Sequence, residues 1–156
     1  MIRRVLFVCL GNICRSPLAQ GVFEHVLVER NRRQEFTIES CGIGGWHVGE
    51  PPDPRTRDVA SRYGITLRSR ARQLATPDDF ARFDLLLAMD RRNLRALNHA
   101  GCPADKARLF LSYAPAELAE RYNMDVPDPY DGGPREFEEV YQLIHHGSQG
   151  LADAIV

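Results

Sequence analysis

The sequence lacks a long hydrophobic run, a strong net charge and a dense set of cysteines. No stretch of about 18 apolar residues occurs, so no membrane-spanning helix is predicted. The 20 Lys and Arg residues nearly balance the 21 Asp and Glu residues, and a net charge of −1 gives no reason to expect nucleic acid or a membrane as a partner. Because no repeat or linker interrupts the chain, we expect residues 1–156 to form a single domain.

The four cysteines, Cys9, Cys14, Cys41 and Cys102, fit neither a zinc spacing nor a disulfide scaffold. We therefore expect reduced thiols in a cytoplasmic protein that holds no metal and needs no cofactor. Cys14 lies in the same loop as Cys9. Two roles for Cys14 remain open: a reversible Cys9–Cys14 disulfide that protects Cys9 from over-oxidation, or simple packing of the loop.

The most informative stretch is residues 5–17, VLFVCLGNICRSP. The apolar run that ends at Cys9 predicts a buried strand, and the amphipathic run that follows predicts a helix. Ser16 suits the N-cap of that helix and Pro17 its first position. Gly11 and Asn12 tolerate the backbone angles of the tight turn between the strand and the helix.

A loop between a strand and a helix N-terminus presents free N–H groups to an anion. We expect a cysteine at the base of such a cradle to be ionised, and the planar guanidinium of Arg15 can bind two oxygens of a phosphate. For Cys9 alone a packing role would be the simpler interpretation, because buried cysteines are common. The Cys-x5-Arg-Ser pattern instead favours a nucleophile. The loop lacks the Lys of a nucleotide-binding loop.

The rest of the chain alternates strand-like and helix-like segments, which predicts an α/β three-layer sandwich with a four-stranded parallel sheet and helices on both faces. In such folds the ligand lies beyond the C-terminal ends of the strands, where Cys9 is expected. We expect no long element in residues 112–133 and a final helix from Pro134 that loosens around Gly147 and Gly150. Further strands are predicted at 36–40, 84–89 and 107–111, and further helices at 53–64, 76–83 and 90–101.

Residues 9–17, CLGNICRSP, resemble the active-site loop of the low-molecular-weight protein tyrosine phosphatases, which also lies at the N-terminus. Asp128-Pro129-Tyr130 is similar to the general-acid loop of that family, although Asp-Pro alone is an ordinary turn former. The resemblance covers essentially the whole chain. It implies strand order 2-1-3-4, Cys9 as nucleophile, Arg15 as the phosphate-binding cation and Asp128 as proton donor and then base.

The resemblance also assigns supporting roles. Trp46 and Tyr130 match the aromatic pocket walls, and Ser40 matches a serine that holds Asn12. Asp90 matches a family aspartate, although capping of a helix accounts for it without more. Ser16 would also donate a hydrogen bond to the Cys9 sulfur. Phosphate binding is assigned to Leu10, Gly11, Asn12, Ile13, Cys14, Arg15 and Ser16.

Three positions depart from or refine the family pattern. Ser69 stands where the family often has a His that supports Asn12, so this support is expected to be weaker or re-routed. Asp131 stands where animal members often have a second Tyr, and an acidic rim would favour basic or less acidic peptides. Ile13 replaces the Thr of a related arginine phosphatase and favours tyrosine.

The function implied is hydrolysis of phosphotyrosine in proteins, and of small aryl phosphates, through a phosphocysteine intermediate. The implied partners are tyrosine-phosphorylated proteins and a cognate tyrosine kinase, with phosphate or other tetrahedral oxyanions as inhibitors, and we expect a monomer. Three alternatives remain. An arsenate reductase of this fold would need a relay of further cysteines. A protein-arginine phosphatase would share the loop. A non-catalytic phosphate-binding module would have lost Cys9 or Asp128.

Overall fold

The computed structural model describes residues 1–156 and contains one four-stranded parallel sheet in the order β2-β1-β3-β4. The predicted fold class and strand order are therefore confirmed. Because all strands run in the same direction, their C-terminal ends meet at one edge, and Cys9 is the last residue of the central β1. The strands are β1 (Arg4–Cys9), β2 (Thr37–Gly42), β3 (Leu85–Ala88) and β4 (Ala107–Leu109).

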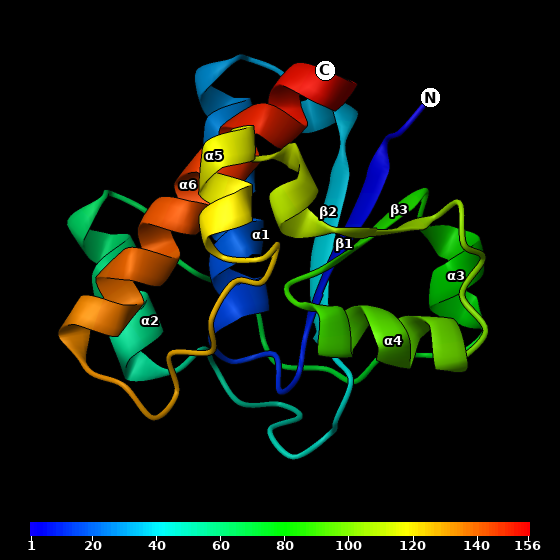
Figure 1. The fold of residues 1–156 in the computed structure, drawn as a ribbon, viewed down its shortest axis with the longest axis horizontal. Coiled ribbons are helices and arrows are strands. Elements are labelled where there is room, and N and C mark those ends of the chain that lie inside the picture. The colour runs from blue at the N-terminus through cyan, green and yellow to red at the C-terminus, as the bar shows by residue number, and fades with distance from the viewer.

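Six α-helices cover the two faces of the sheet (Figure 1). On one side lie α1 (Arg15–Glu29), α2 (Pro54–Arg62), α5 (Ala116–Arg121) and α6 (Pro134–Ile155); on the other lie α3 (Asp78–Arg82) and α4 (Arg91–His99). None of them is both long and apolar enough to span a membrane. Both chain ends lie opposite the edge at which β1 ends in Cys9.

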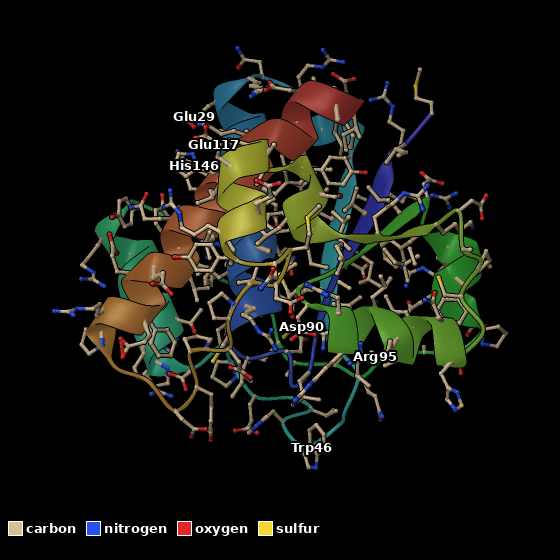
Figure 2. The ribbon with its side chains drawn as sticks, viewed as in Figure 1. Glu29, Trp46, Asp90, Arg95, Glu117 and His146 are labelled. Atoms are coloured by element: carbon tan, nitrogen blue, oxygen red, sulfur yellow. The ribbon has the colours of Figure 1, made fainter.

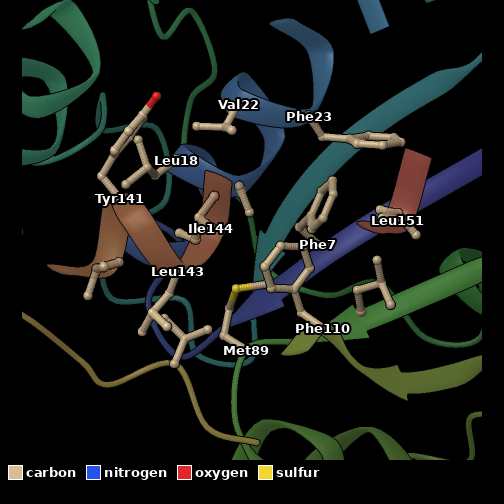
Figure 3. Packing of buried hydrophobic residues seen from close by; sticks show 14 of the residues in the cluster. Phe7, Leu18, Val22, Phe23, Met89, Phe110, Tyr141, Leu143, Ile144 and Leu151 are labelled. Atoms are coloured by element: carbon tan, nitrogen blue, oxygen red, sulfur yellow. The ribbon is translucent and has the colours of Figure 1, made fainter. Parts of the chain in front are cut away.

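The side chains of β1 alternate between two hydrophobic cores, one in each helical layer. Val5 and Phe7 enter the larger core, and Leu6 and Val8 enter the smaller one. Figure 3 shows Phe7 at the centre of the larger core, where its ring packs edge-on against Phe23 at 5.9 Å and Phe110 at 5.8 Å between centroids. Such aromatic pairs contribute about 1 kcal/mol each beyond area burial. This packing on both faces gives Cys9 a rigid support.

Two expectations about the C-terminal half were wrong. The strand expected over residues 107–111 ends at Leu109 and continues as a 3-10 turn, Phe110–Tyr113. Helix α6 is continuous through Gly147 and Gly150 and is not loosened there. Both glycines mark close approaches, because a Cβ at Gly147 would lie 2.4 Å from the Phe110 ring and one at Gly150 only 1.8 Å from the Tyr113 carbonyl oxygen.

The close approach of the Tyr113 backbone to Gly150 leads to a prediction about stability. Gly150→Ala is expected to lower the free energy of unfolding by about 3 kcal/mol, because the methyl group meets backbone that must shift. Urea unfolding measures this, with Gln149→Ala on the exposed side of the same helix as the control. A stabilisation by about 1 kcal/mol, the ordinary gain for Gly→Ala inside a helix, would contradict this packing.

Candidate active site

The loop between β1 and α1 is shaped around Asn12, whose φ of 59° is left-handed. The side-chain amide of Asn12 donates to the hydroxyl oxygens of Ser16 at 2.8 Å and Ser40 at 3.0 Å. Its carbonyl oxygen accepts from the backbone N–H of Arg72 at 2.9 Å. Asparagine tolerates this conformation better than most residues, and these three bonds hold it. The hydrogen bond expected between Ser40 and Asn12 is thus present.

Support for Asn12 from the far side of the loop comes from Arg72 and not from Ser69. The guanidinium of Arg72 binds the buried carboxylate of Asp79 at 2.9 and 3.1 Å. That pair fixes the backbone segment whose N–H reaches Asn12. Of the two expectations for Asn12, weaker support or re-routed support, the structure shows the second, because the hydrogen bond comes from Arg72. The contact with Arg72 could not be predicted from the sequence, because its donor is a backbone N–H, which almost every residue type has.

The role expected for Ser16 as an N-cap was wrong. Cys14 occupies the cap position, without a side-chain hydrogen bond, and α1 begins at Arg15, so Pro17 is its third residue and not its first as expected. The Ser16 hydroxyl lies instead 3.0 Å from the Cys9 sulfur and 3.3 Å from the Cys41 carbonyl oxygen. The backbone N–H of Asn12 donates to the same sulfur at 3.3 Å. The Ser16 hydroxyl and the backbone N–H of Asn12 therefore both contact the Cys9 sulfur.

Gly11 does not supply the left-handed conformation expected of it in the turn. Its φ is not positive, and the left-handed residue of the turn is Asn12. A Cβ at Gly11 would lie 3.2 Å from the His47 ring, which packs over the loop. His47 is held by Glu50, whose carboxylate lies 2.8 Å from Nδ1. Sequence reasoning missed His47, because nothing in its spacing connects it to the loop.

Arg15 is buried, with 3% of its side chain exposed, and acidic groups surround it. One terminal nitrogen donates to the Asp90 carboxylate at 2.6 Å and to the Val126 carbonyl oxygen at 3.0 Å. The other lies 3.5 Å from the Asp128 carboxylate. Burial alone would lower the pKa of Arg15, but Cys9, Asp90 and Asp128 together raise it. Arg15 is therefore a fixed, permanent cation.

Asp90 does more than cap α4. The predicted cap is present, since Asp90 accepts from the Asn93 N–H at 2.8 Å. The other oxygen of its carboxylate holds Arg15, so the expectation that capping alone explains Asp90 was incomplete. Figure 2 shows Asp90 at the start of α4, beside the edge of the sheet at which β1 ends.

The loop that carries Asp128 and two aromatic residues line the same pocket as Cys9. The structure brings together Cys9, Arg15 and Asp128, which lie far apart in the sequence, around a pocket of about 310 Å³. Trp46 and Tyr130 line this pocket with 70% and 48% of their surfaces exposed, so neither is a core aromatic. Figure 2 shows Trp46 at the tip of its loop. The other lining residues are Leu10, Gly11, Ile13, Cys14, His47 and Asp131.

The other three cysteines are poor nucleophiles. Burial raises the pKa of Cys14 to about 12 and raises the pKa of Cys41 and of Cys102. Cys41 and Cys102 lie in the smaller core, in the opposite layer from Cys9. All four thiols are free, and the Cys9–Cys14 disulfide stays a prediction.

The chain is similar to one family of known proteins over nearly its whole length. Residues 4–156 match the model of the family described as "Low molecular weight phosphotyrosine protein phosphatase". A protein of that name from Schizosaccharomyces pombe is 43% identical over 155 residues, covering 97% of this chain and 96% of the relative. A low molecular weight protein-tyrosine-phosphatase from Streptomyces coelicolor is 42% identical over 158 residues, covering 99% and 94%.

A solved structure agrees with these sequence matches. The protein tyrosine phosphatase of Entamoeba histolytica, crystallised with Hepes in the active site, superposes with a TM-score of 0.91 at 31% identity. The superposition covers 98% of this chain and 96% of that one. The similarity therefore extends over the sheet and both helical layers.

Proposed function

Because the chain belongs to the low molecular weight phosphotyrosine protein phosphatase family and is a protein-tyrosine phosphatase, we propose that it works through a phosphocysteine on Cys9. The observation that carries this proposal is that the Ser16 hydroxyl, at 3.0 Å, and the donating backbone N–H of Asn12, at 3.3 Å, both contact one sulfur beside the buried Arg15. A sulfur in that position is a stabilised nucleophile at the base of an oxyanion site.

In the first step, the Cys9 thiolate attacks phosphorus and forms the S–P bond while the bond from phosphorus to the tyrosyl oxygen breaks. Asp128 gives its proton to the departing oxygen, so neutral tyrosine leaves. Arg15 and the loop amides of residues 10–15 stabilise the charge on the equatorial oxygens. Arg15 lies 3.5 Å from Asp128, so a phosphate bound to Arg15 is already next to the acid.

In the second step, water attacks phosphorus on the side that tyrosine has left. Asp128, now a carboxylate, takes a proton from the water, and the S–P bond breaks to release phosphate and the Cys9 thiolate. The Ser16 hydroxyl donates to the sulfur as charge returns to it, because a hydrogen bond to an ionised acceptor is stronger than one to a neutral group. The cycle consumes one water and restores Asp128 to its protonated form.

The pocket supports an aromatic substrate. Trp46 and Tyr130 form walls that suit an aryl ring, and Ile13 adds apolar surface where a phosphoarginine would need a polar partner. Asp131 is an exposed residue of the pocket lining. We propose that it favours basic residues beside the phosphotyrosine.

Several finer assignments are part of the same proposal. The partners are tyrosine-phosphorylated proteins and their kinase, and phosphate or other tetrahedral oxyanions inhibit by occupying the loop. Free thiols support a cytoplasmic location. The continuous sheet and its two cores support a single domain over residues 1–156, and we propose a monomer.

A substrate panel tests the proposal. In EDTA, we expect the protein to hydrolyse phosphotyrosine peptides at least about 100-fold faster than phosphoserine or phosphoarginine peptides, because the pocket has aromatic walls that suit an aryl phosphate. Loss of activity in EDTA would contradict the metal-independent mechanism. Preference for phosphoarginine, or reduction of arsenate with thiols but no hydrolysis, would instead support one of the two rival enzymes.

A further inference from the structure

Arg55, the second residue of α2, lies against the loop that carries the acid. Its guanidinium donates to the Gly132 carbonyl oxygen at 3.2 Å. The same group lies over two aromatic rings, 5.6 Å from the centroid of Tyr130 and 4.6 Å from that of Phe137. Arg55 thus contacts a pocket wall, the end of the acid loop and the first turns of α6.

Arg55 is also tied to the nucleophile loop, through Asp53. Two nitrogens of the guanidinium donate to the two carboxylate oxygens of Asp53, at 3.0 and 2.9 Å. The backbone N–H of Asp53 donates to the Ile13 carbonyl oxygen at 2.9 Å. A continuous chain of hydrogen bonds therefore runs from Ile13 through Asp53 and Arg55 to Gly132. Its two ends lie in the two loops that meet in the reaction.

The acid loop has few other attachments. Within residues 127–132, one hydrogen bond joins Tyr130 to Asp128 and another joins Gly132 to Pro129, both inside the loop. Apart from the ion pair of Asp128 with Arg15, the bond from Arg55 is the only polar contact from this stretch to another segment.

Capping of α2 does not account for this arrangement. The cap needs only the backbone N–H of Arg55, which donates to Asp53 at 2.9 Å. The guanidinium adds a planar, two-point grip that a lysine could not reproduce. Its third nitrogen donates to the carbonyl oxygen of Gly132.

We propose that Arg55 is a positioning residue that holds the acid loop at a fixed place relative to the nucleophile loop. This inference rests on the proposed function, in which Asp128 must reach the leaving oxygen of a phosphate on Cys9. An error of about 1 Å in placing a catalytic group can reduce the rate by about 100-fold.

The test is Arg55→Met, which keeps the apolar stem and removes the donors. We expect kcat/KM for phenyl phosphate, whose leaving group needs a proton, to fall by about 30-fold. The leaving group of dinitrophenyl phosphate needs no proton, so kcat/KM for this substrate should change by no more than about 3-fold. Methylguanidinium should restore part of the phenyl phosphate activity. The matched control is Arg62→Met on the same helix, since Arg62 is exposed and makes no hydrogen bond or ion pair.

An equal loss of kcat/KM on the two substrates would mean a merely structural role for Arg55. No loss would mean that the loop is positioned without Arg55. Either result overturns the inference. If Arg55→Met does not fold, Arg55→Lys serves, because one ammonium cannot serve both Asp53 and Gly132 in the same way. The same uneven loss is expected there. The proposed function fails separately, if Cys9→Ser still hydrolyses either substrate.

Discussion

Cys9→Ser is expected to reduce hydrolysis of aryl phosphates by roughly 10⁴-fold or more. A serine hydroxyl stays protonated near neutral pH unless a base removes its proton. The polar groups in contact with the Cys9 sulfur are the Ser16 hydroxyl and the backbone N–H of Asn12, and neither is a base. The loop therefore supplies no group that could activate a serine hydroxyl at position 9.

The variant should lose turnover and keep binding. Trp46 is the only tryptophan and lines the pocket, so its fluorescence reports occupancy by a phosphotyrosine peptide. The matched control is Cys102→Ser, a buried thiol in the opposite layer, and its activity should equal that of the wild type. Appreciable activity of Cys9→Ser, or equal losses in both variants, would remove Cys9 from the mechanism.

Asp128→Asn is expected to lower kcat/KM for phosphotyrosine peptides by about 10²–10³-fold, the usual contribution of a general acid. The amide keeps the size and the turn of Asp128, whose carboxylate accepts from the Tyr130 N–H at 3.1 Å, but it has no acidic proton to give. Dinitrophenyl phosphate should show a much smaller loss in kcat/KM, because its leaving group departs unprotonated.

The contrast between the two substrates is the informative result. Removal of Asp128 also deletes its contact with Arg15, and this change in charge acts on both substrates alike. A loss that is equal for the two would assign Asp128 to phosphate binding and not to proton transfer.

The fold could be predicted largely from local patterns. The apolar run before Cys9 and the Asp-Pro start of α2 are signals that the chain itself contains, and both elements formed as expected. The continuity of α6 could not be predicted, because Gly147 and Gly150 look like helix breakers until Phe110 and Tyr113 are packed against them.

In the candidate site, too, some residues could be predicted from the sequence and others could not. Cys9, Arg15 and Asp128 belong to two recognisable motifs, which the structure brings to one pocket. The partners that fix these motifs could not be inferred: Asp90 holds Arg15 across 75 positions, and a backbone amide holds Asn12 across 60. Such contacts depend on the strand order and on backbone groups, which the residue types do not encode. The helix-cap interpretation of Ser16 failed because the nearby sulfur engages its hydroxyl.

The most direct test of the central claim is to trap the covalent intermediate. Asp128→Asn mixed with dinitrophenyl phosphate should form the phosphoenzyme quickly and hydrolyse it slowly, because the variant lacks the carboxylate proposed as the base that activates water. After rapid acid quenching, mass spectrometry should find one HPO₃ group on the peptide that contains Cys9, and none in the double variant that also carries Cys9→Ser. A phosphate on another residue, or turnover with no phosphopeptide and no burst of dinitrophenol, would contradict the account.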